Sequence, residues 1–567
     1  MSDSIRDQDQ VTSVDSTGVL GVKLDRRTLL HRGAAAGFAV GSLAFGANSA
    51  SAAPTTVGVG KLVRSQGGQK ELIVNIEDDV NTLDPAKGLG THTLRTIDNM
   101  FNSLVETFGD KAEPQPSLAT EWTSDATGTE WTFKLREGVT FHDGTAFDAE
   151  AVKLSIDRSL FEDHPYHFPP YPFPPFFLAS VKEIQVVDPM TVKFILKAPD
   201  PTFLGNLVWT TSSIVSPAAI KQYGKDIETH PVGTGPFKLV TWEKGKRLVM
   251  EANPDYWGGA PEAQSLIFKP IQEEAARLTQ LQKGDLNIAV ALSPEFIPDI
   301  EKDESLTLLQ NTGIHTWYVQ LNLNYKPLDD VRVRQALNYA IDREAIVKDI
   351  LKGAADVSSS FSYPDTWSYE PKSEIYSYDP EKAKALLKEA GQDSGFKLLY
   401  LVPESGSGMI APKAIGTVMQ AYLQQIGVEV EIQTMEWVSY LNEFVGAGGM
   451  DRKDSGKPPL AMIQMSWMST IADPGLYINY YLRTGGTFNA GSYTNPKMDK
   501  LLDAAMATVD QEQRAGAYSQ AQILAANDAP WIFMFHARNV AAMKKELTGL
   551  TLNPNMNNLK LNTVKFS

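Results

Sequence analysis

The sequence predicts a mixed α/β protein with several lobes, and three observations support this fold class. The chain has 567 residues, more than a single hydrophobic core usually organises. Its composition is 43% apolar, with 10 Trp, 19 Tyr and 24 Phe, which is enough for large cores. Segments with helical and strand periodicity follow one another without a clean series of alternating strands and helices.

The first half of the chain contains both kinds of element. Strands are predicted where apolar residues alternate, and helices where they recur every three or four positions. Asp148 and the residues after it are typical of a capped helix start. The predicted elements are a strand at 70–76, a helix at 91–107, a strand pair at 130–144, a helix at 148–160 and a hairpin at 182–197.

The second half is richer in helices. Asp379-Pro380 and Gly391 are a typical start and stop of a helix. Further helices are predicted at 329–351, 495–507 and 511–528, and a helix followed by a strand at 411–435.

Two other stretches have special composition. "HPYHFPPYPFPPFF", residues 164–177, has prolines that exclude a central strand and favour an extended surface segment. "PVGTGPFKLVTW", residues 231–242, has glycines at 233 and 235, but Pro236 lacks a backbone donor and an alternating apolar run follows. We therefore interpret it as a turn that enters a strand and not as a phosphate-binding loop.

The N-terminus resembles a twin-arginine export signal. Arg26-Arg27 precede an apolar, glycine-rich run at 33–47, which is too short for a good membrane-spanning helix. Ala50-Ser51-Ala52 then matches an Ala-x-Ala cleavage site. We expect a signal peptide at 1–52 that is cleaved near Ala52, a flexible leader at 53–69, and a mature protein outside the cytoplasm.

Charge and cysteine content exclude several classes of function. The formal net charge of −16 argues against nucleic-acid binding. The chain has no cysteine, which excludes disulfides, thiolate metal sites, cysteine nucleophiles and a lipidated N-terminal cysteine. Its 8 histidines show no HExxH motif or tight ligand spacing, and no G-x-S-x-G turn occurs. The sequence therefore predicts no enzyme, no metal site and no cofactor.

An ordered series of motifs runs through most of the remaining chain. The motifs in chain order are "TLDPA" from Thr82, "PSLATEW" from Pro116, "WTFKLREGVTFHDGTAFDAEAVKLSIDR" from Trp131, "PVGTGPFKLVTWEKGKRLVMEANPDYWGGAP" from Pro231, "RLTQLQKGDLNIA" from Arg277, "DDVRVRQALNYAIDREAI" from Asp329, "YDPEKAKALLKEAG" from Tyr378, "YLQQIGVEV" from Tyr422, "WMSTIADP" from Trp467 and "YTNPKMDKLL" from Tyr493. This series resembles the family 5 extracellular solute-binding proteins of ABC importers, of the dipeptide-, oligopeptide- and nickel-binding type. The resemblance covers about Leu72 to Asn539.

The resemblance implies an α/β protein with the type II periplasmic-binding-protein fold, in which two hinged lobes carry an extra domain (cluster C). Domain I is expected at 70–112, 193–312 and 537–567, domain II (the extra domain) at 113–192, and domain III at 313–536. A small solute would be captured between domains I and III. The protein is expected to be a monomer that docks on a membrane permease, which a separate ATPase drives. The alternatives left open are an exported hydrolase and a receptor or chaperone without a permease.

Two departures from the peptide-binding pattern argue against a plain dipeptide ligand. In peptide binders an aspartate in the segment after the tryptophan receives the ligand's amino terminus, whereas the matching residue here is Thr470, three after Trp467. A hydroxyl makes no charge-assisted bond to an ammonium. The loop that holds an arginine in dipeptide binders reads "PESGSG" here, with Glu404 and Ser405 at the expected place. Asp473 is also expected near ligand, although capping a helix is its more ordinary role.

The remaining ligand-binding candidates are Gly90, Thr91 and His92, which match the stretch that domain I contributes, and the aromatic Trp317, for which core packing is the alternative. The insertion at 446–459 is a further possible rim. The predicted ligand is peptide-like by family; an opine, an oligosaccharide or another polar solute comes next, and nickel third.

Overall fold

The computed structural model of the chain describes residues 70–364, 366–406, 409–444, 449–453, 456–468, 473–555 and 558–567. The predicted export signal and leader lie outside these ranges. Within them, no helix combines the length and the apolar character needed to cross a bilayer.

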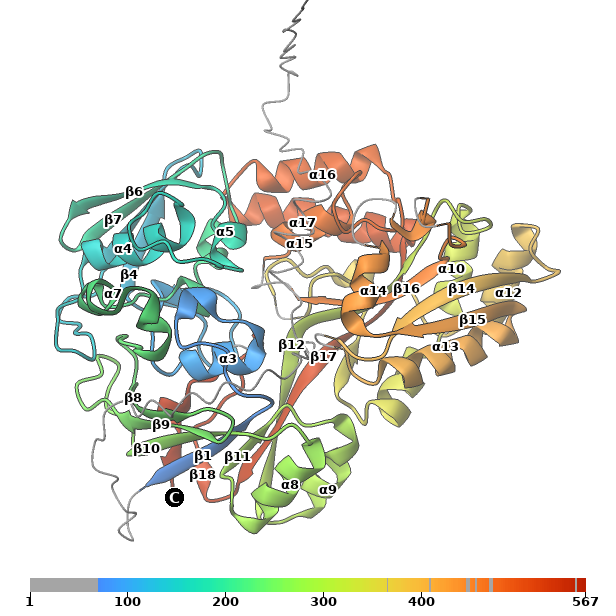
Figure 1. Cartoon of the computed structure of the whole chain (residues 1–567). Helices are drawn as coiled ribbons and strands as arrows, with labels where there is room; N and C mark the ends of the chain where they lie inside the picture. The colour runs from blue at the N-terminus through green and yellow to red at the C-terminus, as the bar shows by residue number, and fades with distance from the viewer. Residues whose placement is uncertain are drawn as a thin grey trace, which may run out of the picture.

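A single large sheet passes through both halves of the molecule (Figure 1). Its two longest strands, β12 (Leu306–Leu321) and β17 (Trp531–Lys544), are antiparallel partners at its centre. On one side of this pair the strands belong to the first lobe, and on the other side to the second lobe. The full order is β15-β14-β16-β12-β17-β11-β1-β10-β9-β8, and β13 also pairs with β17.

The first lobe packs its helices on β1 and its neighbours. β1 is parallel to β10 and β11, and its apolar residues Leu72, Val74 and Ile76 are buried in the lobe's core. The elements of this lobe are β1 (Glu71–Ile76), α3 (Gly90–Ile97), α6 (Phe203–Asn206), α7 (Pro217–Tyr223), β8 (Phe237–Glu243), β9 (Arg247–Ala252), β10 (Ser265–Pro270), α8 (Glu274–Lys283), β11 (Ile288–Val290), α9 (Ile297–Lys302), β18 (Leu547–Thr548) and β19 (Lys565–Phe566).

A separate four-stranded sheet, in the order β4-β5-β7-β6, forms what we call the β4–β7 unit. Its core is aromatic, with Phe133, Phe194 and Phe203 in mutual ring contact. The unit consists of β4 (Ala119–Ser124), β5 (Glu130–Leu135), α4 (Ala149–Leu160), α5 (Pro174–Phe177), β6 (Val181–Asp188) and β7 (Thr191–Leu196), and a short pair, β2 (Val105–Glu106) with β3 (Gln115–Pro116), precedes it. It overlaps the stretch predicted as the extra domain, 113–192, and β7 extends beyond that stretch to Leu196. The domain boundaries stay a prediction.

The second lobe covers its part of the sheet with helices. β14 runs parallel to both β15 and β16, while β16 is antiparallel to β12. Its elements are α10 (Val331–Tyr339), α11 (Arg343–Ala345), β13 (Ala355–Val357), α12 (Pro380–Glu389), β14 (Phe396–Pro403), α13 (Pro412–Gln425), β15 (Val428–Met435), α14 (Trp437–Phe444), β16 (Met462–Met468), α15 (Gly475–Tyr481), α16 (Pro496–Met506) and α17 (Gln511–Asp528).

Two predicted helices are shorter than expected. The helix predicted at 91–107 ends at Ile97, because the chain turns there and its next apolar residues, Met100 and Phe101, fill the first lobe's core from a loop. The helix predicted at 329–351 is interrupted after Tyr339, and Asp342 caps a new start by accepting a bond from the Ala345 N–H.

The aromatic-proline stretch is more buried than predicted. Tyr171 and Phe177 are 7% exposed, and residues 174–177 form α5. The prediction of an extended surface segment was therefore wrong for residues 171–177, because their rings stack on one another and on Trp209 and form a small core with Leu94.

The interpretation of residues 231–242 as a turn that enters a strand is confirmed, since β8 begins at Phe237. Turn geometry is not what requires the glycines, however. Gly233 and Gly235 have ordinary φ angles, and β-carbons built on them would lie 2.2 Å and 2.6 Å from the Met100 carbonyl oxygen. The glycines therefore allow two backbones to touch, and the Gly235 N–H donates to that oxygen at 2.9 Å.

Candidate functional site

The start of α3 holds three of the predicted ligand-binding residues, Gly90, Thr91 and His92. Gly90 has a φ of +75°, and a β-carbon there would lie 2.8 Å from the His92 ring, so glycine lets that ring fold back over the helix start. Burial lowers the pKa of His92, although the Glu77 and Asp78 carboxylates oppose the shift. His92 is therefore a neutral imidazole near pH 7, suited to hydrogen bonding and not to charge pairing.

Further along α3, Arg95 joins this helix to the end of β1 in the first lobe. Its Nη1 lies 2.9 Å from Oε2 of Glu77, the residue that follows β1. Arg95 also lines a small cavity of about 30 Å³ together with Asn539 of β17 and Asn558. The helix that carries the predicted ligand residues is thus anchored to the first lobe through Glu77, and Arg95 faces the same cavity as Asn539 of the shared strand β17.

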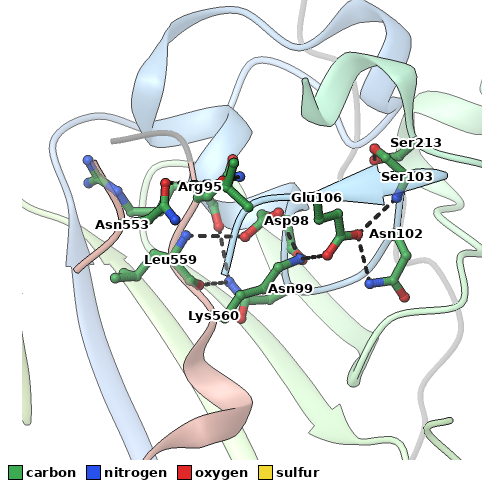
Figure 2. Close-up of polar contacts among 12 residues, drawn as sticks. Arg95, Asp98, Asn99, Asn102, Ser103, Glu106, Ser213, Asn553, Leu559 and Lys560 are labelled. Atoms are coloured by element: carbon green, nitrogen blue, oxygen red, sulfur yellow. Dashed lines mark hydrogen bonds and ion pairs between the residues drawn. The ribbon is translucent and has the colours of Figure 1, made fainter. Parts of the chain in front are cut away.

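A buried polar network fixes the end of α3 (Figure 2). The Lys560 Nζ lies 2.9 Å from Asp98 Oδ1 and 3.0 Å from Glu106 Oε2, and the Leu559 N–H donates to Asp98 at 3.1 Å. Asn99 accepts from the Leu561 N–H and donates to the Leu559 carbonyl. The C-terminal segment of the chain is therefore the brace that holds α3 in place, a role that sequence reasoning missed.

Burial of these charges shifts their pKa values. Desolvation raises the pKa of Asp98 to about 6, the Lys560 ammonium opposes that shift, and the Glu106 carboxylate adds to it. The pKa of Lys560 is raised, because attraction to the two carboxylates outweighs its own desolvation. Two carboxylates thus share one ammonium inside the protein.

The second lobe presents Glu404, Ser405 and Trp467 at one edge of its sheet. β14 ends at Pro403 and β16 at Met468, and because the strands are parallel their carboxyl ends meet at the same edge. Glu404 and Ser405 are exposed. The Glu404 carboxylate lies 3.9 Å from the Lys413 ammonium, a loose pair that leaves it accessible.

Asp473 has a firm structural contact of its own. It is 5% exposed, and its carboxylate lies 2.8 Å and 2.5 Å from the two terminal nitrogens of Arg514. It also accepts from the Gly475 N–H at the start of α15, as the capping alternative expects. This favours a scaffold role, and ligand contact by Asp473 stays a prediction.

Trp317 packs inside the second lobe. Its side chain is 1% exposed and stacks on Phe535 with ring centroids 5.2 Å apart. The alternative of core packing therefore describes it better than an open ligand-facing position does. Two residues back along β12, His315 lies 3.1 Å from the Ser466 hydroxyl, and burial lowers its pKa to about 4.

Thr470 lies outside the described residues, as do parts of the 446–459 insertion. Of that insertion, Arg452 is buried against Glu443 at 3.2 Å, whereas Lys453 is exposed. Among the described residues, no group of three or more His, Asp or Glu side chains is arranged to hold a metal ion. A surface hollow of about 640 Å³ between α8 and α9 contains none of the predicted site residues.

The geometry defines a class of protein. Two α/β lobes share the long strands β12 and β17, and both lobes contribute candidate ligand residues. This is the architecture of a two-lobed binding protein.

The chain belongs to the bacterial extracellular solute-binding proteins, family 5, whose sequence profile matches residues 113–489. It is 31% identical over 475 residues to the dipeptide-binding protein of Escherichia coli (strain K12), covering 80% of this chain and 87% of that one. It is also 31% identical over 490 residues to the glutathione-binding protein GsiB of Pectobacterium atrosepticum, covering 86% and 92%. The structure of HbpA2 from Haemophilus parasuis superposes with a TM-score of 0.79 at 28% identity, covering 88% of this chain and 100% of that one.

Family membership confirms the predicted family and fold class, the type II periplasmic-binding-protein fold. It also confirms that the chain is not an enzyme, since the proteins of this family are binding components of ABC importers. The residues that sequence reasoning missed are His315, Arg514 and Lys560. No spacing signal could have found them, because their partners lie 151, 41 and 462 residues away along the chain.

Proposed function

We propose that this chain is the exported, periplasmic substrate-binding component of an ABC importer, and that it captures a peptide-like or other polar solute between its lobes. The observation that most directly supports this proposal is the shared β12–β17 pair. Its register shifts between Thr312 and Thr316, where the chain passes from one lobe to the other. Such an irregularity lets two sheet halves change their mutual angle. A solute that touches both lobes favours the closed form, which the permease then recognises.

A peptide-like solute has the best support, because a dipeptide-binding and a glutathione-binding protein are among the relatives at 31% identity. The proposed contacts are Gly90, Thr91 and the neutral His92 from the first lobe, with Glu404 and Ser405 from the second. None of these side chains is a free cation that would neutralise a ligand carboxylate. Trp467, Thr470 and Asp473 complete the proposed set. An opine, an oligosaccharide and nickel are the alternatives.

A thermal-shift screen of the chain from Ala53 tests the proposal. The panel holds dipeptides and oligopeptides, opines, oligosaccharides and nickel. A solute that binds only the folded protein adds about 2.7 kcal/mol at a hundredfold excess over its dissociation constant, which is a clear rise in melting temperature. A panel that produces no shift at millimolar concentration would contradict capture of these solutes.

Variants then test the proposed contacts. Glu404→Gln should weaken the binding of a ligand that places a cation near this loop. Glu429→Gln, which replaces an exposed carboxylate on β15, is the matched control. Thr470→Asp should tighten binding of free-amine peptides and leave N-acetylated ones unchanged, because only an ammonium gains a charge-assisted bond. Equal effects on both kinds of peptide would contradict the proposal that Thr470 lies beside the ligand's amino terminus.

A further inference from the structure

The β4–β7 unit touches the second lobe through Val509, which lies between α16 and α17. Val509 packs against the hydrophobic core of the β4–β7 unit. A β-carbon built on Gly128 would lie 2.7 Å from Val509 Cγ1, so the absence of a side chain at Gly128 makes the notch that receives the valine. The apolar side chain of Val509, from the second lobe, thus belongs to the core of the β4–β7 unit.

An aromatic contact lies on the same side of the molecule. Phe176 of α5 stacks on Tyr480 of α15, with ring centroids 5.8 Å apart and an interplanar angle of 24°. Phe176 in turn meets Phe177 edge to face, and Phe177 stacks on Trp209 at 4.5 Å. Tyr480 is therefore the second lobe's addition to a ring stack that otherwise belongs to the β4–β7 unit and the first lobe.

A polar contact completes the set. Nη1 of Arg514, on α17 of the second lobe, donates to the carbonyl of Pro201, in the loop that follows β7, at 3.3 Å. The guanidinium keeps its other partners inside the second lobe: the Asp473 carboxylate at 2.8 Å, the Tyr518 hydroxyl at 2.9 Å and the Ala505 carbonyl at 2.9 Å. Separation of the two parts would cost Arg514 one long bond and leave no buried charge unpaired, so this contact is easily broken and remade.

We propose that Val509, Tyr480 and Arg514 form a latch between the second lobe and the β4–β7 unit, which favours the arrangement of lobes seen here. All three come from the α15–α17 region, and all three meet the β4–β7 unit and the loop that follows β7. Val509 and Tyr480 lie outside the proposed ligand contacts, whereas Arg514 also holds Asp473 of that set. Its effect on ligand affinity rests on the proposed function, whereas its effect on lobe separation does not.

The consequence for binding follows from population shift. If a solute binds the closed arrangement, its apparent dissociation constant rises as the closed fraction of the free protein falls. Loss of one ring contact or one packed valine weakens the latch only partly. We expect each single variant to weaken solute binding several-fold, up to about tenfold, and to leave the melting temperature of the ligand-free protein nearly unchanged.

The absence of cysteine from the chain permits a direct test. Lys182→Cys on β6 and Glu512→Cys on α17, both exposed, accept spin labels on opposite sides of the latch. Double electron–electron resonance then measures the distance in the ligand-free full chain. Tyr480→Ala and Val509→Ala should shift the distribution to longer distances, whereas Tyr480→Phe, which keeps the ring, should not.

Val240→Ala is the matched control, because Val240 is 49% exposed on β8 and away from the junction. A distribution that stays at the wild-type distance in both Tyr480→Ala and Val509→Ala would overturn the latch. Val509→Thr is a milder second variant that keeps the shape and removes the apolar contact. Because the distances are measured without solute, a panel that finds no ligand would contradict the proposed function and leave the latch unaffected.

Discussion

Replacement of Lys560 by methionine removes the buried ammonium between Asp98 and Glu106. Methionine keeps most of the volume of the lysine side chain, so the change is mainly electrostatic. Both carboxylates are nearly inaccessible, with side chains 5% and 3% exposed, so water cannot replace the lost partner. Removing one member of such a buried group typically costs about 3–5 kcal/mol of folding free energy.

The loss should depend on pH because of Asp98. Its pKa of about 6 in the folded protein lies above its ordinary value of 3.8, so the folded state binds the proton more tightly than the unfolded state does. In the wild type this carboxyl contributes stability that is fully present below about pH 4 and is lost as the pH rises through about 6. Without Lys560 the pKa of Asp98 rises further, and a protonated carboxyl needs no cation.

We therefore expect Lys560→Met to destabilise strongly near pH 8 and much less near pH 5. Urea unfolding at the two pH values measures the loss, and hydrogen–deuterium exchange of residues 559–564 localises it to the C-terminal segment. Lys565→Met, an exposed lysine of the same segment, is the control, and Asp98→Asn added to Lys560→Met should recover part of the stability near pH 8. An equal loss at both pH values, or a loss no larger than that of Lys565→Met, would refute this account of the network.

Three further predictions concern single buried positions. Gly235→Ala should destabilise the protein by at least about 2 kcal/mol, since the new β-carbon would lie 2.4 Å from the Met100 carbonyl carbon. A melting temperature equal to that of the wild type would show that the two backbones can move apart to accept it. Gln464→Met should stabilise by about 1–2 kcal/mol in urea unfolding, because neither polar atom of this buried amide has a partner among the described residues; destabilisation would reveal a partner. The pKa of His315 is lowered to about 4, so the unfolded chain binds a proton more readily than the folded protein, and folding stability falls as the pH drops below about 6.5. His315→Gln should therefore reduce by about 2 kcal/mol the stability that is lost between about pH 8 and pH 5. An unchanged pH profile of stability would contradict a neutral buried ring.

Much of the fold could be predicted from local pattern, and the motifs explain why. Asp84 of "TLDPA" and Arg158 at the end of "KLSIDR" are both buried and form a double ion pair, with nitrogen–oxygen distances of 2.6 and 2.8 Å. These family motifs are therefore the scaffold's own contacts between α4 and the first lobe. A series of such motifs identifies the architecture even though each is short.

The candidate site was harder to predict, because its residues are placed by long-range packing. The alternation of β12 includes Trp317, but whether that ring meets solute or Phe535 depends on what lies across the sheet. Asp473 has the right residue type for a ligand contact, and Arg514, 41 residues further on, occupies its carboxylate.

The sequence by itself determined the mixed α/β class, the family, the strand after "PVGTGP" and the absence of cysteine chemistry, because these depend on residue type and on neighbours within a few positions. Only the tertiary structure decided which charges are buried together, where helices stop and which parts of the chain brace one another. Lys560 meets Asp98 across 462 residues, and Val509 fills the notch at Gly128. Such contacts depend on desolvation and shape at a shared surface, and that surface exists only after the strands have paired.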